Sequence, residues 1–190
     1  MAYKDLREFI ALLEKKGLLK RIKAEVDPIL EISEITDRIC KGPGGGKALL
    51  FENVKGSEYP VVTNIFGSFE RMAMALEVEK IDDVAARIND LLKQSPPKTL
   101  MEKLSMLPKL LEFSKFFPKT VKNAPCQEVI EKDNPDLSKF PIIKCWPGDV
   151  APLITWPLVV TQAPEGGPYN VGVYRMQYVD KKRAIMRWLK

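Results

Sequence analysis

Residues 22–51 read IKAEVDPILEISEITDRICKGPGGGKALLF, and this stretch predicts the core of the first part of the fold. Residues 22–26 alternate between apolar and charged side chains, which is typical of a strand with one buried face. Isoleucines then recur at helical spacing from Ile32 to Ile39, and the apolar run Ala48–Phe51 follows. We therefore expect a strand–helix–strand unit.

Both connections in this unit have sequence signals. Asp27 precedes Pro28, which predicts a helix with Asp27 as its N-cap and Pro28 as its first residue. The run GPGGGK at residues 42–47 resembles the end of a phosphate-binding loop, but it lacks the GxxxxGK[ST] spacing and precedes a strand. We interpret it as a flexible turn.

The flanking residues extend this unit into a small domain. Apolar residues between Leu6 and Leu13 share one helical face, and Gly17 stands where a helix C-terminal glycine is common. The remaining patterns predict a strand near residues 59–62 and helices over residues 69–76 and 81–93. Residues 1–95 are therefore expected to form an α/β domain.

Residues 96–124 differ in composition from the domain before them. This stretch is helical in character, is interrupted by Pro108 and Pro118, and carries many lysines among leucine, methionine and phenylalanine. It is expected to be a connecting helical arm. Its apolar face would pack on the protein's own domains or, as the open alternative, contact a membrane surface or admit an apolar substrate.

Residues 125–190 have the character of a β region. Strands are predicted at residues 142–143, 158–161, 171–179 and 184–189, with a hairpin turn at residues 180–182. These strands are too few to close a barrel, so the β domain is expected to be truncated at Lys190.

Composition excludes several kinds of chemistry. The 190 residues include no histidine, which rules out a Ser-His-Asp triad, a Cys-His pair and any histidine-ligated metal within this chain. The three cysteines are far apart, which favours free thiols, and the N-terminus lacks an export signal, so a cytoplasmic location is expected. A net charge of +5 is mild and does not predict nucleic-acid binding.

The run YNVGVYR at residues 169–175 is the strongest chemical candidate. Asn170 offers an amide oxygen suited to Mg or Mn, Gly172 permits close approach of a ligand, and Arg175 can hold a carboxylate or phosphate with two nitrogens. An ordinary strand with an exposed arginine fits the same residues. The two Trp-Pro pairs at Trp146 and Trp156 are interpreted as buried structural indoles.

Five ordered motifs resemble the UbiD family of decarboxylases in order and spacing: APCQ at 124–127, CWPGD at 145–149, APLITWPL at 151–158, NVGVYR at 170–175 and IMRWL at 185–189. The N-terminal part is similar as well, from YKDLREF to the NIFGS run at Asn64. The resemblance covers essentially the whole chain.

The resemblance implies an α+β fold, with an N-terminal α/β domain followed by the beginning of a flavin reductase-like split β-barrel at residues 125–190. It implies non-oxidative decarboxylation of a 4-hydroxybenzoate-type aromatic acid, with or without a polyprenyl tail, in quinone biosynthesis. Such enzymes use prenylated FMN, made by a separate flavin prenyltransferase, together with Mn²⁺ and often K⁺. A homo-oligomer is expected.

The motifs also assign site residues by resemblance. Asn170 matches the metal ligand, and Arg175 matches a catalytic arginine that holds the substrate carboxylate. The flavin-contacting residues are Val173, Tyr174 and Arg175 in one run and Arg187, Trp188 and Leu189 in another. A second metal-binding acid and the proton donor would follow Lys190, so the chain alone is expected to be inactive. A non-catalytic assembly module and a flavin reductase-like oxidoreductase remain as alternatives.

Overall fold

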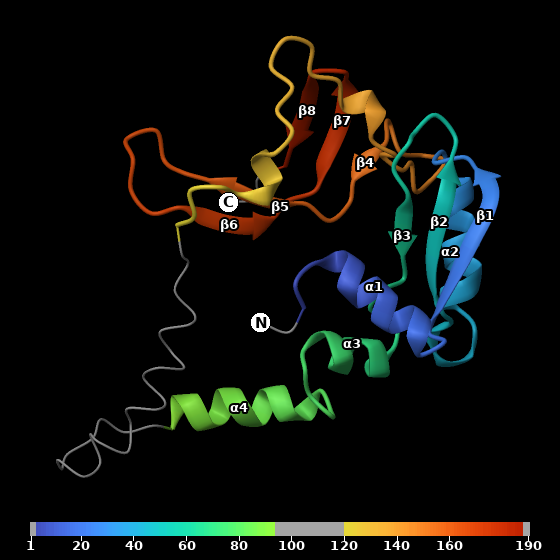
Figure 1. Cartoon of the computed structure of the whole chain (residues 1–190), viewed down its shortest axis with the longest axis vertical. Coiled ribbons are helices and arrows are strands. Elements are labelled where there is room, and N and C mark those ends of the chain that lie inside the picture. The colour runs from blue at the N-terminus through green and yellow to red at the C-terminus, as the bar shows by residue number, and fades with distance from the viewer. Residues whose placement is uncertain (1–2, 94–119, 188–190) are drawn as a thin grey trace. The chain divides into compact units, whose positions relative to one another are not determined.

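A three-stranded sheet with strand order β1–β2–β3 lies at the centre of the N-terminal part of the computed structural model, which describes residues 3–93 and 120–187 (Figure 1). β1 (Leu19–Val26) and β2 (Ala48–Val54) are parallel, and α2 (Glu31–Cys40) connects them. β3 (Val61–Thr63) pairs antiparallel to β2. The strand–helix–strand prediction is confirmed, although β1 begins three residues before the predicted Ile22.

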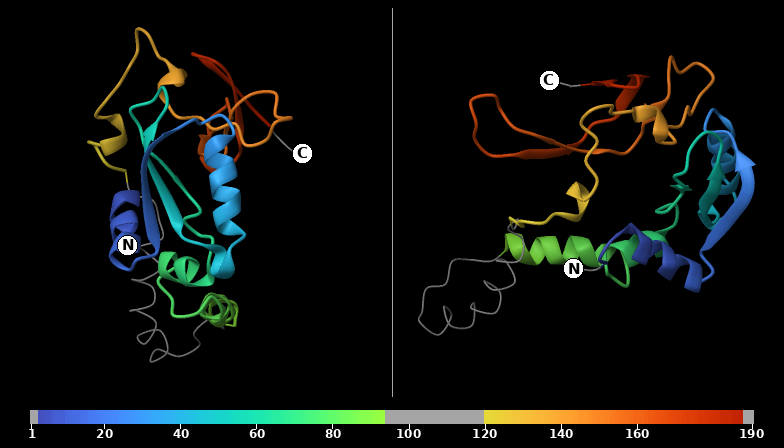
Figure 2. Two further views of the ribbon diagram at one scale, coloured as in Figure 1. Left: turned by 90° about the vertical axis from the view of Figure 1, so that its right-hand side faces the viewer. Right: turned by 45° about the horizontal axis from the view of Figure 1, so that its top comes forward.

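β2 is the middle strand, and both of its faces are buried. Ala48 and Leu50 belong to one apolar cluster with Phe9 of α1 (Leu6–Lys15), whereas Leu49 and Phe51 belong to a second cluster with Ile32 of α2. Because successive side chains of a strand point to opposite faces, one apolar run supplies both clusters. Figure 2 (left) shows the sheet between α1 and α2. Burial of each large side chain contributes about 1.5–3 kcal/mol.

The ends of the first helix match the sequence signals. Asp5 is the N-cap of α1, and its carboxylate accepts a hydrogen bond from the Glu8 amide at 3.0 Å. Gly17 follows the C-cap residue with a φ of +70°, a conformation that favours glycine. The prediction that Gly17 closes this helix is confirmed.

The predicted start of α2 is wrong. The helix begins at Glu31 rather than Pro28, and Leu30 is its N-cap, with a φ of 71°. The Asp27 carboxylate instead accepts a hydrogen bond from the Ile29 amide at 2.8 Å, closing a local turn. The Pro28 carbonyl and the Leu30 amide bond to the backbone of Lys144, each at 3.0 Å, so a long-range contact holds this stretch outside the helix.

The glycine run at residues 42–47 is a turn, as predicted, but it is held in place. It forms a single 3-10 turn, η1 (Pro43–Gly45), and the Asn64 side-chain amide donates to the carbonyls of Gly45 and Lys47 at 2.8 and 3.0 Å. A β-carbon on Gly45 would overlap the carbonyl oxygen of Gly67. The interpretation as a flexible turn is corrected, because this loop packs against the 64–67 loop with no room for a side chain.

This packing predicts a difference between two neighbouring glycines. Gly45→Ala should lower the free energy of unfolding by about 2 kcal/mol more than Gly44→Ala, since overpacking adds a cost of about 1–3 kcal/mol. Both glycines have positive φ, but a β-carbon on Gly44 meets nothing within 4 Å. Denaturant titration of the two variants measures the difference, and equal midpoints would contradict the close packing.

Three further helical segments complete the described part of this region. α3 (Phe69–Ala75) begins at Ser68, whose hydroxyl accepts from the Arg71 amide at 3.2 Å. α4 (Asp82–Leu92) agrees with the predicted helix over residues 81–93. α4 and η2 (Pro125–Gln127) belong to one compact unit, and this unit spans residues 82–134. Residues 1–81 and 135–190 form the other unit.

The predicted arm falls largely outside the described residues. Of residues 96–124, only 120–124 are described, and they contain no helix. The division into a domain, an arm and a β domain stays a prediction. Within residues 3–93 and 120–187, no helix is long and apolar enough to cross a bilayer.

The C-terminal part forms two small sheets. β4 (Leu153–Ile154), β7 (Met176–Asp180) and β8 (Arg183–Met186) make an antiparallel sheet in the order β4–β7–β8, and β5 (Leu158–Thr161) pairs with β6 (Asn170–Val173). The β5 strand and the β7–β8 hairpin confirm the sequence predictions. The described residues form no closed barrel, so the split barrel stays a prediction.

Two strand predictions in this part are wrong. Residues 171–179 were expected to form one strand, but the chain leaves one sheet at Val173 and enters another at Met176. Residues 142–143 form no strand: Ile143 makes one isolated bridge, to Leu153. Alternating apolar residues cannot indicate which sheet a strand joins, because that choice depends on distant partners.

Residues 137–144 attach this part to the first sheet. Ile29 and Lys144 form a parallel bridge, and the Ser57 hydroxyl donates to the Lys139 carbonyl at 2.7 Å. The rings of Tyr59 and Phe140 stack with their centroids 5.2 Å apart. These contacts explain why residues 135–190 belong to the same compact unit as residues 1–81.

Asp136 anchors the β7–β8 hairpin to η3 (Leu137–Lys139). Its carboxylate accepts from the Ser138 hydroxyl and amide at 2.5 and 2.8 Å and pairs with Lys181 at 3.0 Å. The Ser138 hydroxyl, the Lys181 ammonium and the Ser138 amide together lower the pKa of Asp136 from 3.8 to about 2.

A lowered pKa in the folded state has a defined effect on stability. The contribution of Asp136 should be fully present above its ordinary pKa of 3.8 and should be lost as the pH falls toward 2. Asp136→Asn should remove this part of the pH dependence. An NMR titration of the Asp136 carboxyl tests the prediction directly, and an ordinary pKa in the folded protein would contradict it.

Candidate active site

The NVGVYR run does not lie on one surface. Asn170 and Val173 both belong to β6, where they pair with Thr161 and Leu158 of β5. Residues 170 and 172 share one face of this strand pair, whereas residues 171 and 173 point to the other. The side chains of Asn170 and Val173 therefore lie on opposite faces, so the metal and flavin assignments do not converge through both side chains.

The Tyr174 ring folds back over Gly172. A β-carbon built on Gly172 would lie 2.5 Å from Cε2 and 2.9 Å from Cζ of this ring. Tyr174 is half-buried, although Val173 and Arg175 on either side are exposed. The ring thus covers the face that Asn170 shares.

Two of the assigned arginines are brought to the same end of one sheet. In the β7–β8 hairpin, Met176 pairs with Met186. Arg175 directly precedes Met176 and Arg187 directly follows Met186, so both arginines flank the last pair of this ladder, just outside the two strands. Both side chains are exposed, and the described residues provide no ion-pair partner for either. Two free guanidinium groups at one sheet end favour an anionic ligand.

The same register connects this sheet end to β4. Ile154 of β4 pairs with Met176, the residue that follows Arg175, and Thr155 comes directly after Ile154. The sequence did not predict β4, which is only two residues long. Trp188 and Leu189, the other assigned flavin contacts, lie outside the described residues.

A large apolar groove of about 1740 Å³ reaches Thr155. It runs along one side of α2 and β3 and along residues 137–156, ending at Thr155 and Trp156. Trp146 and Trp156 are 66% and 74% exposed within it. The interpretation of these indoles as buried structural residues is corrected. The described residues that line the groove include no lysine or arginine, and its charged residues are Glu31, Glu34 and Asp37. The rest of the lining is mostly apolar, so the groove suits an apolar group without negative charge.

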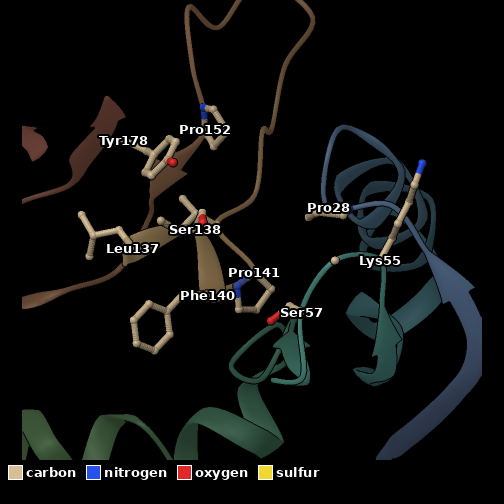
Figure 3. Close-up of a pocket in the computed structure, with 11 residues that line it drawn as sticks. Pro28, Lys55, Ser57, Leu137, Ser138, Phe140, Pro141, Pro152 and Tyr178 are labelled. Atoms are coloured by element: carbon tan, nitrogen blue, oxygen red, sulfur yellow. The ribbon is translucent and has the colours of Figure 1, made fainter. Parts of the chain in front are cut away.

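A smaller cavity of about 150 Å³ lies where residues 137–142 meet the 55–57 loop (Figure 3). Three of its polar side chains already have partners in the protein: Ser57 donates to the Lys139 carbonyl, Ser138 donates to Asp136, and Lys55 pairs with Asp27 at 3.1 Å. Figure 3 shows the Lys55 side chain extending away from Phe140. We therefore assign this cavity to the junction and not to a ligand site.

The metal assignment has limited support in the geometry. Asn170 is exposed and could provide one oxygen ligand. Within the described ranges, no group of three or more histidine, cysteine, aspartate or glutamate residues could hold a metal ion. The described residues therefore supply one ligand and not a complete site. All three cysteines are free, with Cys40 and Cys126 exposed.

Family models cover most of the chain. The N-terminal domain model of 3-octaprenyl-4-hydroxybenzoate carboxy-lyase matches residues 10–91, and the Rift-related domain model of the same enzyme matches residues 119–190. The chain belongs to the UbiD family. The resemblance found in the sequence motifs is thereby confirmed, as is membership of a family of carboxy-lyases.

Relatives and solved structures agree with this membership. An uncharacterized protein of Aquifex aeolicus is 47% identical over 98% of this chain, and one of Archaeoglobus fulgidus is 49% identical over 99%. The chain spans 38% of the length of each relative.

Among solved structures, an evolved dimeric form of the UbiD-class enzyme HmfF from Pelotomaculum thermopropionicum, in complex with prFMN, is 31% identical, with a TM-score of 0.75. That match covers 98% of this chain and 39% of the other. The closed form of vanillic acid decarboxylase from Sedimentibacter hydroxybenzoicus is 30% identical over 98% of this chain and 37% of that protein, with a TM-score of 0.76.

Proposed function

We propose that this UbiD-family chain forms the N-terminal part of a prenylated-FMN-dependent enzyme that removes CO₂ from an aromatic acid without net oxidation. The observation that carries the proposal is the pairing of Met176 with Met186 at the open end of the β7–β8 hairpin, because Arg175 and Arg187 flank this pair. Both belong to motifs assigned to the flavin, and the HmfF relative is a complex with prFMN. Two exposed cations suit a flavin phosphate together with a substrate carboxylate.

Each residue has a defined role in this proposal. When bound, the prenylated flavin supplies an electron acceptor for the electron pair that remains after CO₂ leaves. Arg175 holds the substrate carboxylate with its planar guanidinium, and Arg187 adds positive charge for the cofactor phosphate. Asn170 contributes one oxygen to a Mn²⁺ ion, and the other metal ligands come from outside the described residues.

The groove supports a narrower choice of substrate. Pockets for small ligands have volumes of about 300–1,000 Å³, so a groove of 1740 Å³ leaves room beyond a single aromatic ring. Its lining ends at Thr155 and Trp156, shortly after Ile154, which pairs with the residue that follows Arg175. We propose a 4-hydroxybenzoate-type acid with a polyprenyl tail lying in the groove, as in quinone biosynthesis.

The proposal includes several partners. A flavin prenyltransferase would supply the cofactor, K⁺ would accompany Mn²⁺ at the phosphate, and the enzyme would work as a homo-oligomer in the cytoplasm. A tailed substrate would also require contact with a membrane surface, where such lipids reside.

The test uses the full-length protein reconstituted with prenylated FMN. We expect CO₂ release from tailed 4-hydroxybenzoate, and Trp146→Ala and Trp156→Ala should raise KM for the tailed acid but not for an untailed one. No flavin binding at all would favour the assembly-module alternative. Nicotinamide oxidation with unmodified FMN would favour the flavin reductase alternative, and equal KM changes for both acids would remove the groove from the proposal.

A further inference from the structure

The Tyr174 ring can lie in its present position only because residue 172 is a glycine. The ring atoms Cε2, Cζ and Oη lie 2.5, 2.9 and 3.1 Å from the point where a β-carbon of residue 172 would be. Contacts under 3 Å between a β-carbon and carbon atoms are sterically excluded, so any other residue at this position must displace the ring.

The backbone itself does not require glycine here. The φ angle of Gly172 is not positive, and the residue pairs with Val159 in the regular β5–β6 register. Alanine would therefore fit the strand without backbone strain. The atoms in its way belong to the far end of one side chain, so the substitution would move the ring and leave the strand unchanged.

The displaced ring belongs to the candidate site. Asn170 and Gly172 lie at a spacing of two on β6, so their side-chain positions share a face. Tyr174 comes just after this strand, and its ring lies back over Gly172 on that face. Arg175 follows Tyr174 directly and lies just before β7, at one end of the β7–β8 sheet.

We propose that Gly172 is a positioning residue: its missing side chain makes the space that holds the Tyr174 ring over β6, on the face that Asn170 shares, where the ring contacts the flavin. This inference rests on the proposed function for the identity of the ligand. The placement of the ring itself rests only on the geometry of residues 172 and 174.

The experiment compares two glycines of residues 135–190 in the full-length protein. Gly172→Ala should weaken FMN binding by about tenfold, the effect of losing one well-placed aromatic contact. Gly148→Ala is the matched control, because its φ is also not positive and a β-carbon there meets nothing within 4 Å. Titration of FMN absorbance or fluorescence measures both dissociation constants.

Two additional measurements separate a positioning role from a general defect. In apo protein with labelled tyrosine, Gly172→Ala should shift the ring resonances of Tyr174, whereas Gly148→Ala should not. In the Tyr174→Ala background, Gly172→Ala should have no further effect on FMN affinity, since no ring remains to be displaced. This double variant also remains informative if Gly172→Ala alone folds poorly, because removing the ring restores the space.

The outcomes are distinct. Unchanged Tyr174 resonances in Gly172→Ala, parental FMN affinity in that variant, or effects of the two substitutions that multiply would each overturn the inference. A parent protein that binds no FMN would instead overturn the proposed function, whatever happens to the ring.

Discussion

Replacing Arg175 by lysine is expected to lower the decarboxylation rate on the order of a hundredfold, because one well-placed charged contact is worth a few kcal/mol in the transition state. Lysine keeps the positive charge but loses the planar, two-nitrogen contact with a carboxylate. Most of the flavin should stay bound, since Arg187, directly after β8, still supplies positive charge. Bound-flavin absorbance and the rate of CO₂ release, measured on the full-length protein, separate the two effects.

A matched control lies in the same hairpin. Arg183 pairs with Asp180 at 2.6 Å near the turn, at the other end of β8 from Arg187. Arg183→Lys should leave turnover near the parental value, because exposed ion pairs contribute little. Parental turnover in Arg175→Lys would return the NVGVYR run to its alternative, an ordinary strand with an exposed arginine. Asn170→Ala should weaken metal-dependent retention of the cofactor.

Arg71→Met is expected to lower the free energy of unfolding by about 3–5 kcal/mol, because buried acceptors that lose their donor each cost about 1–3 kcal/mol. Arg71 is 2% exposed, and its guanidinium donates to the carbonyls of Ile65, Gly46 and Asn64 at 3.1, 2.7 and 3.2 Å. Burial lowers the pKa of Arg71, and the negative charge of Glu70 acts in the opposite direction. Methionine fills much of the same volume but donates no hydrogen bond.

Arg7→Met provides the comparison for Arg71→Met, because Arg7 is exposed on α1. Denaturant titration followed by circular dichroism gives both changes, and the control should stay within about 0.5 kcal/mol of the parent. Arg71→Lys should fall between them, since an ammonium group cannot span three carbonyls. A loss in Arg71→Met no larger than in the control would show that the guanidinium does not hold the 42–47 and 64–67 loops together.

The sequence predicted which residues belong to the candidate site better than it predicted how they are arranged. The motifs placed Asn170, Tyr174, Arg175 and Arg187 in one family pattern, and the family is now shown. The roles of these residues stay predictions. The sequence could not reveal that Met176 pairs with Met186, next to Arg175 and Arg187, because strand register depends on pairing between segments that no local pattern specifies.

Local patterns determined the elements whose causes are local. The apolar run Ala48–Phe51 predicted the strand β2, and Gly17 predicted the end of α1, because side-chain periodicity and positive φ are properties of a few neighbouring residues. Distant contacts decided the rest. The backbone of Lys144 bonds to the residues on either side of Ile29, and α2 therefore begins later than predicted. Gly67 fills the space beside Gly45 and holds the glycine run 42–47 in place, although its sequence is typical of a flexible loop. Each of these outcomes depends on a hydrogen-bond donor or a carbonyl more than twenty residues away, which no local window of sequence contains.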